Sequence, residues 1–174
     1  MAPSTESPSS ESPAPILPIL EQCRGLPEQR FAAGTVLLAE GATTGLLIVL
    51  IEGEVEILKG DFQIATVADP GAIFGEISLL LEKPHMATVR ATAPVRAYVA
   101  EGGAAFLRGH PELATEISRL LAQRLHGLTT YLVDLKRQFE DRADHLGMVD
   151  DVLETLAHQQ RASFTPGSDR DPEM

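Results

Sequence analysis

The sequence predicts a mainly β domain, a small barrel or sandwich of short strands, followed by a long α-helical segment. Two observations carry this prediction. Between Glu28 and Glu101, apolar and polar residues alternate in short runs separated by glycine, which is the pattern of half-buried strands. After Pro111, apolar residues recur at steps of three and four, which is the period of a helix.

The strands are expected where apolar residues stand two apart, and the turns where glycine separates these runs. The alternating sets are Val36/Leu38, Ile48/Leu50, Val55/Ile57, Phe62/Ile64 and Val95/Ala97/Val99. Glycine adopts positive φ at little cost, so turns are expected at Gly34, Gly41, Gly45, Gly53, Gly60 and Gly71. A short helix is expected ahead of the strands, from Ile16 to Cys23, with Pro18 in its first turn.

The helical segment carries a leucine-rich stripe. Its positions are Leu121, Leu125, Leu128, Leu132, Leu135 and Phe139, and the same frame continues through Leu146, Val149, Leu153 and Leu156. A heptad pattern of this length favours a coiled-coil seam between two copies of the chain, the alternative being packing onto its own domain. A second stripe, Leu113, Ile117 and Leu120, is expected to pack on the chain's own strands. Gly127 and residues 144–147 weaken the helix, so one long helix and two helices both remain open.

Composition defines the expected domains and excludes several classes of protein. We expect a disordered tail at 1–15, a β domain at 16–111, a helical arm at 112–161 and a second tail at 165–174. The single cysteine, Cys23, indicates a reducing compartment, so a cytoplasmic location is expected.

No stretch is apolar enough to cross a membrane, and the net charge of −11 argues against binding of DNA. The histidines show no metal-ligand spacing and no catalytic motif is present, so the chain is not expected to be an enzyme.

Residues 71–91 form the segment with the strongest chemical signal. A glycine turn opens a short apolar helix between two strand-like runs. The start of a helix presents N–H groups and a positive dipole end, so it can hold an anion. Gly75 would let a ligand approach the backbone, and Glu76 would accept hydrogen bonds from ligand hydroxyls. The alternative for Glu76 is a helix-terminal acid that the dipole favours without any ligand.

Several motifs, taken in order, resemble the cyclic-nucleotide-binding domains of the catabolite-activator type. They are AGTVL at 33–37, EG at 40–41, EGEV at 52–55, FGEISLL at 74–80, ATVRA at 87–91 and HPEL at 110–113. The resemblance covers roughly residues 28–130. It implies an eight-stranded, jelly-roll-like antiparallel β-roll, a phosphate-binding cassette at 74–88 and a C-terminal helix that closes over the pocket. Residues 140–164 are too short and too acidic for the helix-turn-helix of such activators, so no DNA-binding domain is expected.

The resemblance also implies roles for individual residues. Glu76 would bind the ribose 2′-hydroxyl, and the N–H groups of Ile77, Ser78 and Ala87 would meet the cyclic phosphate. Thr129 falls where such proteins place a hydroxyl that reaches the purine, commonly from the partner subunit. The candidate ligand is cyclic AMP or cyclic GMP, and no cofactor or metal is implied.

The cassette departs from the family at two positions. Where the family places an arginine followed by Ser or Thr, this chain has His85 and Met86. Loss of a charge-assisted phosphate contact costs about 2–5 kcal/mol. Two functions therefore stay open. One is a dimeric sensor that binds a cyclic nucleotide through an altered cassette and acts on a separate, unknown effector protein. The other is a ligand-independent scaffold that keeps the β-roll.

Overall fold

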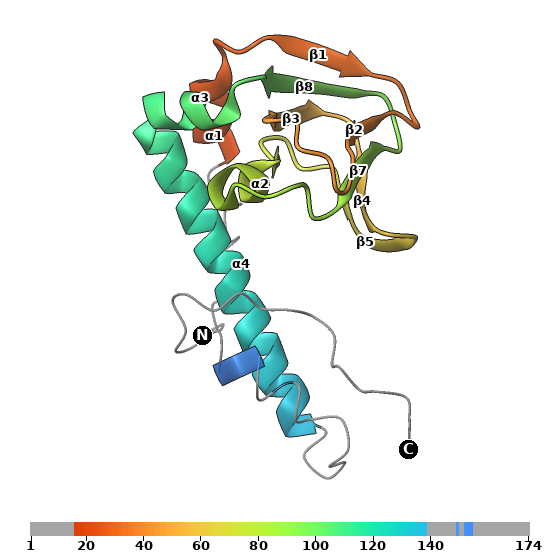
Figure 1. Cartoon of the computed structure of the whole chain (residues 1–174), viewed down its shortest axis with the longest axis vertical. Helices are drawn as coiled ribbons and strands as arrows, with labels where there is room; N and C mark the ends of the chain where they lie inside the picture. Colours follow the sequence, from red (N-terminus) through yellow and green to blue (C-terminus); the bar gives the residue numbers. More distant parts are fainter. Residues whose placement is uncertain (1–15, 139–148, 150–151, 155–174) are drawn as a thin grey trace, which may run out of the picture. The chain divides into compact units, whose positions relative to one another are not determined.

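Eight strands form two four-stranded antiparallel sheets around one core (Figure 1). The computed structural model describes residues 16–138, 149 and 152–154. One sheet has the strand order β1-β8-β3-β6 and the other has the order β2-β7-β4-β5. The strands are β1 (Glu28–Phe31), β2 (Val36–Leu38), β3 (Leu47–Glu52), β4 (Val55–Lys59), β5 (Phe62–Val67), β6 (Ile73–Phe74), β7 (Thr88–Ala91) and β8 (Val95–Ala100). The mainly β fold with a C-terminal helix, predicted from the sequence, is confirmed.

Between residues 16 and 138 the strands are accompanied by helices α1 (Ile16–Cys23), α2 (Glu76–Leu81), α3 (Gly103–Gly109) and α4 (Pro111–Gln138). The predicted opening helix is confirmed with its expected bounds, whereas α3 was not predicted. The chain divides into two compact units, Met1–Ile117 and Ser118–Met174, so the boundary falls inside α4. Gly127 does not interrupt α4. The expected tails, and the leucine frame from Phe139 to Leu146, lie outside the described residues.

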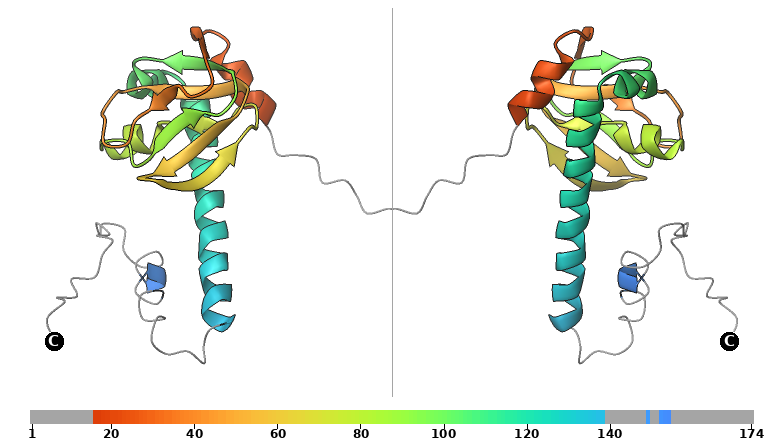
Figure 2. Two further views of the ribbon diagram at one scale, coloured as in Figure 1. Left: turned by 90° about the vertical axis from the view of Figure 1, so that its right-hand side faces the viewer. Right: turned by 90° about the vertical axis from the view of Figure 1, so that its left-hand side faces the viewer.

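The core of the first unit lies between the two sheets, and both contribute to it (Figure 2). Ile48 and Leu50 of β3 are among its fully buried side chains. The expectation that β3 is only half-buried is wrong, because Leu47–Leu50 are all buried. This strand lies between β8 and β6 in its sheet, and α1 packs against it. Leu113 and Ile117, at the start of α4, are also buried, as predicted for the second stripe.

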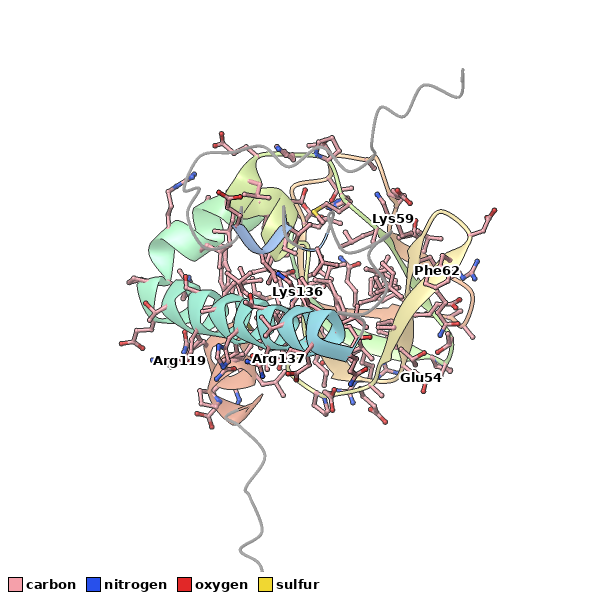
Figure 3. All side chains as sticks on the ribbon, turned by 90° about the horizontal axis from the view of Figure 1, so that it is seen from below. Glu54, Lys59, Phe62, Arg119, Lys136 and Arg137 are labelled. Carbon is pink, nitrogen blue, oxygen red and sulfur yellow. The ribbon has the colours of Figure 1, made fainter. Side chains whose placement is uncertain are left out.

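The two apolar residues that were predicted to face the core from β5 face solvent instead. Phe62 and Ile64 are 74% and 57% exposed, while Ala65 and Val67 are half-buried. The β4–β5 ladder shifts register between Ile57 and Leu58, and β5 is an edge strand. Figure 3 labels Phe62 and Lys59, which pair across this hairpin. A bulge changes the phase of the side chains that follow it, which the spacing of apolar residues does not reveal.

A similar irregularity affects β2. Val36 is 48% exposed, whereas Leu37 and Leu38 are both buried. The β2–β7 register shifts between Val36 and Leu38, so two consecutive residues can face the core. The expected Val36/Leu38 pair is therefore wrong at Val36. The predicted turns are correct, since Gly34, Gly41, Gly45, Gly53, Gly60 and Gly71 all have positive φ.

Candidate ligand-binding site

Gly75 connects β6 to α2 and has a φ of +91°. A Cβ atom at this position would lie 2.3 Å from the carbonyl oxygen of Leu46. The glycine is therefore required by the close approach of the chain's own backbone, in addition to its left-handed conformation. The sequence suggested a close approach by a ligand. The structure shows an internal reason, which needed the position of Leu46.

Glu76 is the first residue of α2 and is only 4% exposed. Carboxylates are seldom so deeply buried unless they are partnered, and a helix N-terminus favours a negative charge. Ile77 and Ser78 follow in the same turn. The first N–H groups of a helix have no acceptor within it, so this turn can donate to a ligand.

Hydrogen bonds within the cassette terminate α2 at its C-terminal end. The Ser78 hydroxyl donates a hydrogen bond to the carbonyl oxygen of Lys83. The Lys83 N–H donates in turn to the carbonyl oxygen of Ser78, at 3.1 Å. Glu82 takes the left-handed conformation, with a φ of +53°, and ends the helix. The hydroxyl of Ser78 is thus engaged within the cassette, while its N–H group belongs to the first turn of α2.

His85 is buried, with 5% of its surface exposed. Its side chain and its backbone are both hydrogen-bonded. Its Nε2 atom lies 2.8 Å from Thr44 Oγ1. Its N–H donates to the carbonyl of Ala42 at 2.9 Å, and its carbonyl accepts from the N–H of Gly41 at 2.8 Å. Burial lowers the pKa of the His85 imidazole below its usual range. Burial therefore favours the neutral form of this imidazole, and its hydrogen bonds tie the end of the cassette to the loop after β2.

Met86 is 55% exposed, and its backbone is held from the β4–β5 hairpin. The Lys59 ammonium group donates to the Met86 carbonyl at 2.7 Å and to Glu40 Oε1 at 2.6 Å. The other carboxylate oxygen of Glu40 accepts from the Gly60 N–H at 2.8 Å. The hydrogen bond from Lys59 holds the pKa of Glu40 below its usual range. Figure 3 shows Lys59 in this region.

Glu40, Thr44 and Lys59 are site residues that the sequence reasoning missed. Glu40 stood inside one of the recognised motifs, so its position carried a signal. The Glu40 N–H also donates to Thr88 Oγ1 at 3.0 Å, which adds a link between the loop after β2 and the end of the cassette. Nothing in the sequence indicated Lys59 or Thr44. The β4–β5 hairpin and the loop after β2 reach residues 85–88 only in the folded chain.

Seven of the predicted site residues lie in one sequence segment of the first unit: Gly75, Glu76, Ile77, Ser78, His85, Met86 and Ala87. Thr129 belongs to the second unit, where its hydroxyl donates to the carbonyl of Leu125 at 2.8 Å. Among the described residues, no group of three or more His, Cys, Asp or Glu side chains could hold a metal ion. Burial raises the pKa of the Cys23 thiol to about 11, which leaves it unreactive.

Comparisons with known proteins agree with this architecture. Residues 28–107 match the family model of the cyclic nucleotide-binding domain. The chain is 29% identical over 111 residues to the CRP-like cAMP-activated global transcriptional regulator of Mycobacterium tuberculosis, covering 60% of this chain and 50% of that protein. The chain therefore spans about half the length of this curated relative. No described helix is long and apolar enough to cross a membrane.

Two solved structures show the same fold. The Thermus thermophilus catabolite activator protein aligns with a TM-score of 0.57 at 22% identity, covering 73% of this chain and 61% of that one. A structure of Sp-2Cl-cAMPS bound to PKAR CBD2 aligns with a TM-score of 0.50 at 25% identity, covering 63% and 71%.

The first unit is thus a β-roll of two antiparallel sheets, with the short helix α2 inserted between β6 and β7. Residues 28–107 of this chain match the cyclic nucleotide-binding domain family. The resemblance drawn from the ordered sequence motifs is thereby confirmed.

Proposed function

We propose that this chain is a non-enzymatic sensor module that binds a nucleotide-type ligand at residues 74–88 and regulates a separate partner protein. The observation that carries the proposal is the position of Glu76. Its carboxylate is buried at the first turn of α2, inside a segment that the family model covers. A buried acceptor next to helix N–H groups can bind a ribose hydroxyl together with a neighbouring polar group of the ligand.

The stripe on α4 supports action as a homodimer. Leu125 and Leu128, two members of the stripe, are 45% and 51% exposed. Exposed apolar side chains at heptad spacing are typical of a surface that pairs with another helix. In a dimer of this kind, α4 would relay occupancy of the cassette, and Thr129 would lie on the paired helices.

The scaffold function is favoured by one specific observation, the anchoring of His85. Three hydrogen bonds of this residue hold the end of the cassette without any ligand. A scaffold would retain these contacts and show no response to nucleotides. Ligand binding therefore separates the two functions.

Thermal unfolding of the full chain with millimolar cyclic AMP or cyclic GMP tests the proposal, with ribose and inorganic phosphate as controls. Binding to the native state raises the melting temperature by mass action, and ligand at ten times Kd stabilises by about 1.4 kcal/mol. We expect a small rise for the wild type. A larger rise is expected for the double variant His85→Arg/Met86→Thr, whose affinity should increase at least tenfold. If neither protein responds while both remain folded, the scaffold function replaces the sensor.

A further inference from the structure

The cassette carries a net negative charge. Residues 74–88 contain the carboxylates of Glu76 and Glu82 and one ammonium group, that of Lys83. His85 lies in the same segment, where burial disfavours its charged form. The cyclic phosphate of a cyclic nucleotide also carries a negative charge. An anion would therefore approach a site of its own sign, on a chain whose net charge is −11.

The cation beside the cassette is already neutralised. Lys59 lies 2.6 Å from the carboxylate of Glu40 and donates a second hydrogen bond to the Met86 carbonyl. One carboxylate oxygen of Glu40 accepts from Lys59 and the other accepts from the Gly60 N–H, so the position of this carboxylate is fixed. A phosphate would have to compete with Glu40 for this ammonium group.

One hydroxyl group of the cassette is also already used as a donor. The Ser78 hydroxyl donates to the Lys83 carbonyl. A phosphate would therefore depend largely on the N–H groups at the start of α2, and burial of its charge without a matching cation is costly. Ribose hydroxyls are donors themselves, so a carboxylate such as Glu76 satisfies them.

We propose that this cassette selects an uncharged nucleoside over the corresponding cyclic nucleotide. This proposal depends on the proposed function for the location of the binding site. What it adds is that the preferred ligand carries no charge. Met86 is consistent with this selection, because its exposed side chain places a neutral thioether beside the segment that would face the phosphate.

Calorimetric titration of the full-length chain with adenosine, guanosine, cyclic AMP and cyclic GMP tests the inference at fixed pH and salt. The wild type should bind one nucleoside at least tenfold more tightly than its cyclic monophosphate. Met86→Arg adds a cation at an exposed position, so it should shift this ratio at least tenfold toward the cyclic nucleotide. Glu40→Gln leaves Lys59 without its carboxylate and should shift the ratio about threefold in the same direction.

Glu21→Gln is the matched control, because it changes the net charge equally on the exposed surface of α1 and should leave the ratio unchanged. Equal or tighter binding of the cyclic nucleotide by the wild type overturns the selectivity and leaves the sensor function standing. A ratio that Met86→Arg does not move, in a folded variant, also overturns it. If no nucleoside and no cyclic nucleotide binds any of these proteins, both the inference and the proposed function fail.

Discussion

At the scale of single residues, the altered cassette is defined by where two side chains point. His85 turns inward and bonds Thr44, while Met86 is exposed. From the sequence alone, both stand at the positions where the family places its phosphate-binding pair. The difference between them follows from the packing of the loop after β2, which holds both the N–H and the carbonyl of His85.

Because burial lowers the pKa of His85, its neutral form stabilises the fold. The folded state binds a proton less readily than the unfolded state, whose imidazole has the ordinary pKa of 6.5. Stability should therefore be fully present above this value and should fall as pH decreases below it. Urea unfolding of wild type and His85→Gln between about pH 7.5 and pH 5 measures the difference, since glutamine does not titrate. The exposed His110→Gln serves as the control. A wild type that declines no more than His85→Gln would show that this imidazole is not held neutral.

Gly75 gives a second prediction at this scale. Gly75→Ala would place a methyl group 2.3 Å from the Leu46 carbonyl oxygen, at a φ of +91°. We expect a loss of about 3 kcal/mol or more in the free energy of unfolding. Gly34→Ala is a matched control, because Gly34 has a φ of +87° but no neighbour within 4 Å of the added methyl. It should cost about 1 kcal/mol. Equal losses in urea unfolding would contradict the argument from the Leu46 contact.

At the scale of elements, period-two and period-3.6 patterns predicted the type of each element better than its exposed face. Ile16 to Cys23 forms the expected helix, and the glycine turns lie where they were expected. Phe62 and Val36 face solvent because register shifts in the β4–β5 and β2–β7 ladders change the phase of alternation. A bulge is a property of a strand pair, so a single strand's sequence does not contain it. The short helix α3 is only about two turns long and both begins and ends with glycine, so it gave no clear pattern to recognise.

The stripe on α4 gives the prediction for this scale. Leu128→Glu/Leu132→Glu would place like charges across a helix–helix seam, where the cost of desolvation is not recovered. Sedimentation should then show a monomer, whereas the wild type is expected to be a dimer. Thr130→Glu adds charge on the opposite side of α4 and should remain dimeric. A double variant that still sediments as a dimer would remove the stripe from the interface.

At the scale of the whole molecule, the fold was predictable because its signals are repeated. Ordered motifs from Ala33 to Leu113 and the glycine spacing each indicated the same β-roll, and the family match at residues 28–107 agrees with them. The site was predictable in part. Glu76 and Gly75 lie within one continuous segment, whereas Lys59 and Thr44 reach the cassette only through the folded chain. Long-range contacts of this kind carry no local pattern.

The central claim is that ligand is recognised at residues 74–88, and amide NMR shifts of the full-length chain test it most directly. Titration with adenosine and with cyclic AMP should move the amide signals of Gly75 to Ser78 and of Met86 to Thr88 first. The amides of Ala104, Leu107 and Ala114, which together with Leu79 and Leu80 of α2 line a hollow, should stay in place. Shifts centred on that hollow, or no shifts with either compound at millimolar concentration, would contradict the account.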